Sequence, residues 1–167
     1  FEFCPMNLEE AVKKGKITKV QQSFIIYQIA EGMKYVHSCK IIHQNLKPSN
    51  ILISEDGIIK ISGFENVKST IEKETMIDIY SFGEIVYFIL SGGEFPENGK
   101  ESDLTSFHIL AQQLIYACWE NDIDCKLSFG IIIDVLEEND FNLNSLSQQE
   151  VQQLLQMIRQ YKSKVLF

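Results

Sequence analysis

The chain lacks the charge pattern of a nucleic-acid-binding protein. Its 15 Lys and Arg residues are outnumbered by 23 Asp and Glu residues, which leaves a formal net charge of −8. No basic stripe offsets this charge, so we expect no binding to nucleic acid or to an anionic membrane surface. The sequence also has no apolar run long enough to cross a bilayer, and no signal peptide opens it. We therefore expect a soluble, cytoplasmic domain.

The four cysteines lack the spacing of a metal site or a redox motif. Cys4, Cys39, Cys118 and Cys125 are scattered along the chain, and no two of them form a Cys-x-x-Cys pair. Structural zinc sites and catalytic dithiols are typically built from such closely spaced thiols. We interpret the cysteines as free, buried thiols in a reducing compartment.

Internal repeats and low-complexity tracts are also missing. What the 167 residues do contain is a hairpin signal in the first half of the chain. The segments Ile51–Ile53 and Ile58–Ile61 flank Ser54-Glu55-Asp56-Gly57, and Asp-Gly between β-branched runs is typical of a tight turn. The polar loop His43–Asn50 precedes this hairpin, and Gly63-Phe64-Glu65 follows it.

Helical periodicity dominates the rest of the chain. Apolar residues recur at helical spacing over residues 18–38 and 76–90, which predicts two long helices. A shorter helix is expected between Asn7, which can cap its start, and Gly15. A final amphipathic helix is expected after Ser147, which forms a capping box with the glutamate three positions later. Its apolar stripe either packs on the domain, which we favour, or binds a partner.

The polar loop and the tripeptide after the hairpin resemble the catalytic loop and the metal-binding loop of eukaryotic protein kinases. The family pattern is His-Arg-Asp-Leu-x-x-x-Asn, followed after a hairpin by Asp-Phe-Gly. Residues His43–Asn50 and Gly63–Glu65 follow this frame position by position. Asn45, however, stands where the family has its catalytic base, and Gly63 stands where it has a metal ligand. The chain therefore resembles a protein kinase that has lost its catalytic aspartates.

Three further segments follow the order of motifs in the C-terminal lobe of a kinase. Asp78–Gly83 resembles Asp-x-Trp-Ser-x-Gly, with Tyr80 at the tryptophan position. Leu114–Trp119 resembles the penultimate kinase helix, and Lys126–Phe129 resembles the Arg-Pro-Ser-Phe start of the last one. Several motifs in the right order are more specific than any one alone. The Cys-Trp and Ser-Phe-Gly residues are nearer to the tyrosine-kinase-like families than to the calcium- or cyclin-regulated ones.

This resemblance implies a mainly α fold, a protein-kinase-like C-lobe over residues 1–139 with a small β-hairpin at the catalytic loop. Residues Phe1–Cys4 look like the hinge strand that joins the two kinase lobes, so we expect the N-lobe to be absent from this chain. Residues 140–167 are expected to form a C-terminal extension that carries the amphipathic helix.

The resemblance also implies roles for the loop positions. No catalytic residue is expected, because His43, Asn45 and Lys47 hold degenerate family positions. Asn50 and Lys47 are candidate cofactor-binding residues only if a nucleotide binds. No metal site is expected at the family positions Asn50 and Gly63, because glycine offers no ligand atoms.

Three residues are expected to be structural. Asp78 corresponds to the family aspartate that holds the backbone of the catalytic loop. Phe64 corresponds to the ring that stacks with His43 in a spine through the lobe, and Trp119 is expected in the core.

The interval between the second degenerate motif, at Gly63, and the aspartate of the next helix is short for the family. Gly63 and Asp78 are only 15 positions apart. An active kinase fits its activation loop, a peptide-docking loop and an Ala-Pro-Glu motif into this interval, and that motif is missing here. The arginine that pairs with its glutamate is replaced by Lys126. The deletion favours a loss of chemistry more strongly than the substitutions do.

Together these features predict a catalytically inactive pseudokinase domain that acts in signalling as a protein-binding, scaffolding or regulatory module. Its expected partners are other proteins, with an upstream N-lobe as one possibility, and no cofactor is expected. One alternative is an atypical or residual ATP-dependent Ser/Thr or Tyr kinase whose N-lobe lies outside this chain, with ATP and Mg²⁺ as cofactors. A third is a degenerate fragment with no function beyond folding.

Overall fold

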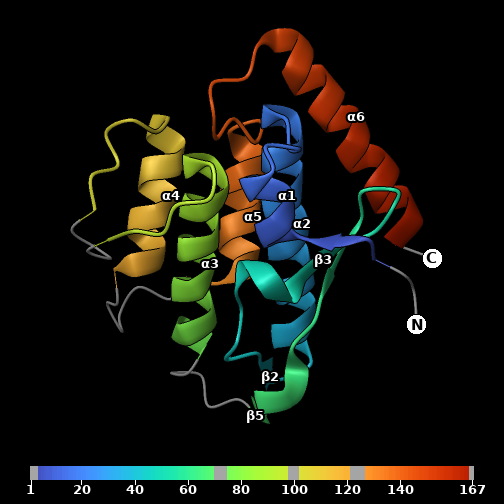
Figure 1. Cartoon of the computed structure of the whole chain (residues 1–167), viewed down its shortest axis with the longest axis vertical. Helices are drawn as coiled ribbons and strands as arrows, with labels where there is room; N and C mark the ends of the chain where they lie inside the picture. Colours follow the sequence, from blue (N-terminus) through green and yellow to red (C-terminus); the bar gives the residue numbers. More distant parts are fainter. Residues whose placement is uncertain (1–3, 70–74, 98–101, 121–126, 166–167) are drawn as a thin grey trace.

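The long helix predicted over residues 18–38 is the centre of the molecule. In the computed structural model, which describes residues 4–69, 75–97, 102–120 and 127–165, it forms α2 (Lys19–Ser38). Thr18 and Gln21 close its N-terminus with a capping box, each side chain accepting the other residue's backbone N–H. Other elements surround α2, and its buried side chains form the middle of the hydrophobic core (Figure 1).

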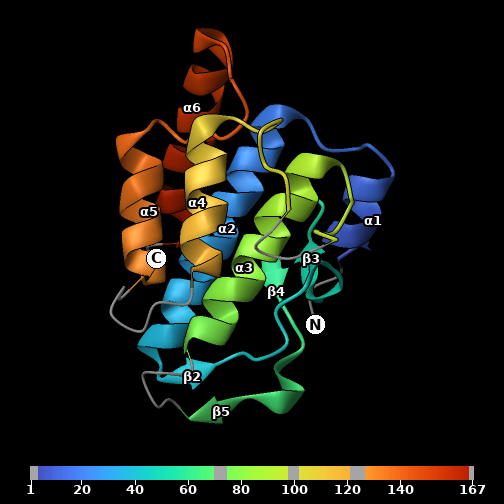
Figure 2. The ribbon, with the colours of Figure 1, turned by 90° about the vertical axis from the view of Figure 1, so that its left-hand side faces the viewer.

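The remaining helices pack around α2. Figure 2 shows α3, α4 and α5 side by side with α2, while α6 lies behind them. Their bounds are α1 (Leu8–Lys13), α3 (Thr75–Ser91), α4 (Ile109–Trp119), α5 (Phe129–Glu138) and α6 (Gln148–Val165). Each predicted helix is therefore present, and the mainly α fold class is confirmed. None of the helices in the described ranges is both long and apolar enough to cross a membrane.

The predicted hairpin is confirmed as β3 (Ile51–Ile53) and β4 (Ile59–Ile61), with Ile53 opposite Ile59. A short strand, β1 (Met6–Asn7), adds to the other edge of β3. A second two-stranded sheet joins β2 (Ile41–Ile42) to β5 (Lys68–Ser69). The sequence did not predict these three strands, because two residues are too few to show an alternating pattern. Most of the predicted hinge strand lies outside the described residues.

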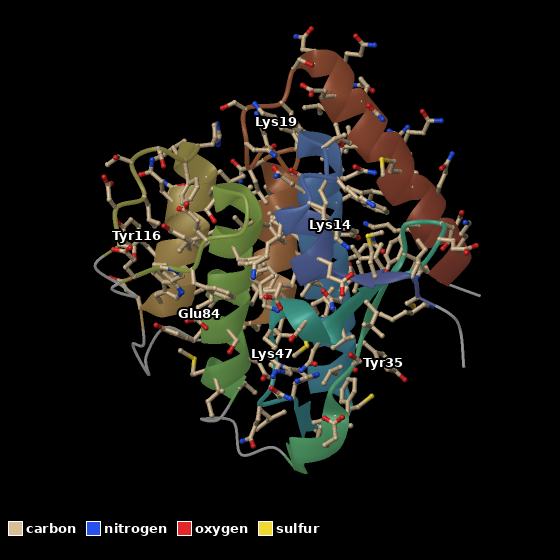
Figure 3. All side chains as sticks on the ribbon, in the orientation of Figure 1. Lys14, Lys19, Tyr35, Lys47, Glu84 and Tyr116 are labelled. Atoms are coloured by element: carbon tan, nitrogen blue, oxygen red, sulfur yellow. The ribbon has the colours of Figure 1, made fainter. Side chains whose placement is uncertain are left out.

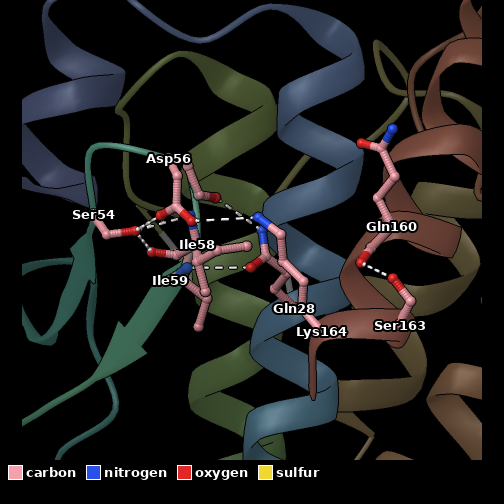
Figure 4. A network of polar contacts seen from close by, with 9 residues as sticks. Gln28, Ser54, Asp56, Ile58, Ile59, Gln160, Ser163 and Lys164 are labelled. Atoms are coloured by element: carbon pink, nitrogen blue, oxygen red, sulfur yellow. Dashed lines mark hydrogen bonds and ion pairs between the residues drawn. The ribbon is translucent and has the colours of Figure 1, made fainter. Parts of the chain in front are cut away.

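A buried glutamine fixes the hairpin to α2 (Figure 4). The side chain of Gln28 is fully buried, yet both of its polar ends are paired. Its Nε2 donates to the carbonyl oxygen of Gly57 at 3.2 Å, and its Oε1 accepts from the N–H of Ile59 at 3.1 Å. Ser54 closes the turn, its Oγ accepting from the N–H of Ile58 at 3.1 Å. Because a buried amide is stable only when it is paired, these bonds fix the position of the hairpin, and of the loops at its ends, on α2.

The C-terminal segment packs against the outer face of α2. The predicted capping box is present, since Ser147 and Glu150 exchange hydrogen bonds at the start of α6. Leu154 and Ile158 of the apolar stripe are buried, and Tyr161 packs edge-on against the rings of Phe24 and Tyr27. We favoured packing of this stripe on the domain, and that prediction is confirmed. Residues of the preceding loop, Phe141 and Leu143, are buried in the same core.

The prediction of buried thiols is correct for one cysteine and wrong for another. Cys118 is buried in α4, and burial raises the pKa of its thiol well above the usual range, which keeps it protonated. Cys39, by contrast, is exposed, because it follows the last turn of α2 at the surface. Cys4 is partly exposed, and Cys125 lies outside the described residues.

Candidate functional site

A buried carboxylate anchors the polar loop that precedes the hairpin. Asp78, on the first turns of α3, is fully buried. Its Oδ2 accepts from the backbone N–H of His43 at 2.8 Å, and its Oδ1 accepts from that of Gln44 at 2.9 Å. The Nε2 of His37, from the last turn of α2, lies 2.9 Å from the same Oδ2. Three donors from two segments thus converge on one charge, which fixes the start of the loop against α2 and α3.

The His43 ring connects the loop to the segment after β4. Its Nδ1 accepts from the backbone N–H of Asn45 at 3.2 Å, so we assign the ring proton to Nε2, which donates to the carbonyl oxygen of Ser62 at 2.9 Å. Both ring nitrogens are therefore engaged in hydrogen bonds. The ring also lies against Phe64, with 4.6 Å between ring centroids. His43 is fully buried, whereas Phe64 is 40% exposed.

Asn50 connects the same two segments from the other end of the loop. Its Nδ2 donates to the carbonyl oxygen of Asn45 at 2.7 Å. Its own carbonyl oxygen accepts both from the backbone N–H of Ser62, at 2.8 Å, and from the Oγ of Ser62, at 3.0 Å. The loop and the end of the hairpin are therefore held together by direct hydrogen bonds at both ends.

Gly63 follows Ser62 with a left-handed backbone, at φ +87°. A Cβ placed on this residue would lie 2.4 Å from Nδ2 and 2.7 Å from Cγ of Asn50. Both distances are shorter than real Cβ atoms tolerate, so the Asn50 amide fills the space that a side chain at position 63 needs. Only glycine fits here without a shift of Asn50.

The remaining residues of the predicted site lie at or near the surface. Asn45 is half-buried, and Lys47 is exposed in the extended backbone before the short 3₁₀ helix Pro48–Asn50 (Figure 3). Glu65 is exposed in a second 3₁₀ helix, Phe64–Asn66. Trp119 lies apart from this site, fully buried at the end of α4. The structure therefore brings His43, Asn45, Asn50, Gly63, Phe64 and Asp78 together and leaves Lys47 facing solvent.

The loop residues do not fit the metal that a protein kinase uses. Mg²⁺ prefers carboxylate oxygens in a nearly ideal octahedral arrangement. Here the neutral amides of Asn45 and Asn50 stand at the family's base and metal-ligand positions, and Gly63 adds no ligand atom. Within the described ranges of the chain, no three His, Cys, Asp or Glu side chains cluster as they would around a metal ion.

Sequence reasoning missed the part played by His37. Its partner Asp78 lies 41 positions further along the chain, on a different helix. A histidine near the end of a helix carries no signal of such a contact. Only the packing of α2 against α3, with the ring of Phe129 edge-on to His37 at 5.1 Å, places the imidazole beside the carboxylate.

Comparisons with known proteins find sequence similarity to protein kinases. Residues 1–76 match the family model of the protein kinase domain. The chain is 45% identical to Mitogen-activated protein kinase 14 of Xenopus laevis over 69 residues, which is 41% of this chain and 19% of the relative. It is 31% identical to Extracellular signal-regulated kinase 7 of Drosophila melanogaster over 90 residues, 53% of this chain and 10% of the relative. It is 30% identical to Mitogen-activated protein kinase 15 of Caenorhabditis elegans over 108 residues, 64% of this chain and 19% of the relative.

The chain thus spans a fifth or less of the length of these curated relatives. The matched region contains the polar loop, the hairpin and Gly63, whereas the later motifs, from Asp78 onward, lie outside it. The tyrosine-kinase-like character stays a prediction. Residues 1–76 of the chain belong to the protein kinase superfamily.

Proposed function

We propose that this chain is a catalytically inactive, C-lobe-like kinase domain that acts by binding other proteins. One observation carries the proposal: the loop is fully assembled, yet the family positions of both catalytic aspartates are held by groups without a carboxylate. Asp78 and His43 hold the loop in place. At the position of the catalytic base, Asn45 supplies an amide. At the position of the metal ligand, Gly63 has no side chain.

The chemistry of phosphoryl transfer supports this reading. The reaction depends on metal ions that neutralise the phosphates and on a residue that positions the attacking hydroxyl. The amide of Asn45 is similar in shape to a carboxylate, but it does not accept a proton near neutral pH. Lys47 keeps a positive charge at the surface of the loop. A single exposed cation does not replace a metal bound between two phosphates.

The surface beside the loop supports the protein-binding half of the proposal. Tyr35 of α2 is 70% exposed and Phe64 is 40% exposed (Figure 3 labels Tyr35). Both residues line a shallow, mostly apolar groove of about 350 Å³, together with Val36 of α2 and with Ile59 and Ile61 of β4. Exposed aromatic side chains around an apolar hollow are typical of surfaces that bind other proteins. An apolar segment of a partner protein would fit this surface.

The retained polar residues favour a second candidate function. Asn50 and Lys47 are the residue types that an active kinase uses at these positions. Under this alternative, the chain is part of an atypical or residual kinase that binds ATP and Mg²⁺, with an N-lobe supplied by residues outside this chain.

A thermal-shift titration of the longest soluble form of the protein with ATP, with and without Mg²⁺ or Mn²⁺, separates the two functions. We expect no metal-dependent change in its melting temperature. A ligand present at 100 times its dissociation constant stabilises a folded protein by about 2.7 kcal/mol. For a chain of this size that corresponds to a rise of roughly 5–10 °C. Such a rise would contradict the proposal, and an active mitogen-activated protein kinase measured in parallel provides the positive control.

A further inference from the structure

We infer that Asn50 and Gly63 form a latch that holds the loop to the end of the hairpin without a metal ion. The inference rests on the proposed function, in which no cation joins the loop to the segment after the hairpin. A direct contact between Asn50 and Gly63 then joins them. The space left by the missing ligand at position 63 is filled by the side chain of Asn50. The effects of substitutions at these two positions on stability are therefore coupled.

Asn50 is bonded on both sides of the junction. Its Nδ2 bonds the carbonyl oxygen of Asn45 within the loop, at 2.7 Å. Its backbone carbonyl oxygen accepts two hydrogen bonds from Ser62, the residue directly before Gly63. The residue therefore has little freedom to move, and its amide group cannot turn away from position 63 without losing the bond to Asn45.

Gly63 completes the latch by having no side chain. Three atoms of the Asn50 side chain, Nδ2, Cγ and Oδ1, lie 2.4, 2.7 and 3.1 Å from the position of a Cβ on residue 63. The three nearest atoms that the structure describes around this position therefore all belong to Asn50. The close approach is specific to Asn50, and the amide occupies the space in which an aspartate at this position would begin.

The chain contains a matched control for the backbone of Gly63. Gly57, in the turn of the same hairpin, has a similar left-handed backbone at φ +78°, but a Cβ added there meets nothing within 4 Å. Replacing Gly57 with alanine therefore measures the cost of the backbone conformation alone. Replacing Gly63 with alanine measures the same cost plus the displacement of Asn50.

The test is a double-mutant cycle on melting temperature, measured with the full chain in a buffer containing EDTA. Gly57→Ala should lower the melting temperature by roughly 3 °C, and Gly63→Ala should lower it by at least twice as much, roughly 6 °C or more. In an Asn50→Ala background, Gly63→Ala should cost no more than Gly57→Ala does. Coupling of this kind is expected between residues in contact and is not expected between distant, independent sites.

Equal costs of Gly63→Ala and Gly57→Ala in the unmodified background would overturn the latch. Should Gly63→Ala fail to fold, recovery of folding on addition of Asn50→Ala supports the latch, and failure of the double variant overturns it. The outcome is separate from that of the proposed function. A metal-dependent shift of the unmodified chain rejects the proposed function, whereas absent coupling in EDTA rejects the latch alone.

Discussion

Replacement of Asp78 with alanine is expected to lower the free energy of unfolding by about 3–5 kcal/mol. The carboxylate is fully buried and accepts hydrogen bonds from the backbone of His43 and Gln44, with His37 as a third partner. Removal leaves these donors buried and without an acceptor, and the loop loses its connection to α3. Urea denaturation followed by the fluorescence of Trp119, the one tryptophan of the chain, measures the change.

The isosteric change Asp78→Asn is the matched control. It keeps one oxygen that accepts a hydrogen bond and replaces the other with an amide group that donates. We expect roughly half the loss of the alanine variant. Hydrogen exchange of the His43 and Gln44 amides should accelerate in both variants, because their acceptor is Asp78. An alanine variant within about 1 kcal/mol of the unmodified chain, with both amides still protected, would contradict the anchoring role.

Replacement of Trp119 with alanine is expected to cost about 3–5 kcal/mol, since it leaves a large cavity between α3 and α4. The indole is fully buried, and the rings of Tyr80 and Tyr87 lie 6.3 and 6.1 Å from it. Gly83 of α3 approaches so closely that a Cβ there would lie 2.9 Å from the indole Nε1. Because Gly83 has no side chain, it offers nothing that could fill the space left by the indole. Urea denaturation followed by far-ultraviolet circular dichroism suits this variant, which has lost its fluorophore.

The matched control here is Trp119→Phe. The indole Nε1 is buried and has no hydrogen-bond partner in the part of the chain that the structure describes. Phenylalanine removes this unpaired donor while keeping most of the apolar volume, so we expect a loss of about 1 kcal/mol or less, well below that of alanine. A phenylalanine variant as unstable as the alanine variant would show that the indole N–H contributes a hydrogen bond.

The elements predicted from the sequence are those whose signals are local. The hairpin follows from Asp56-Gly57 between two β-branched runs, and α2 follows from its long apolar periodicity. Capping residues and turn glycines act within a few positions, so they can be recognised in one sequence. The same holds for α6, where Ser147 and Glu150 mark the start.

The contacts that were not predicted join residues far apart in the chain. Gln28 binds the turn 29 positions away, and His37 reaches Asp78 across 41 positions. The sequence identified Gly63 as the loss of a ligand, but the contact with Asn50 appears only when the hairpin places residue 63 beside the loop. Long-range contacts of this kind depend on tertiary packing and leave no periodic signal.

The central claim is that the loop keeps its structure without a cation. The most direct test is a Mn²⁺ titration of the isotope-labelled chain, in the presence of ATP, followed by nuclear magnetic resonance. Paramagnetic Mn²⁺ broadens the signals of nearby nuclei, so the reporters are the backbone amide of Gly63 and the side-chain amide of Asn50. We predict no broadening of these signals beyond that of exposed amides elsewhere. Selective broadening at both residues would show that a metal binds between them and would contradict the account.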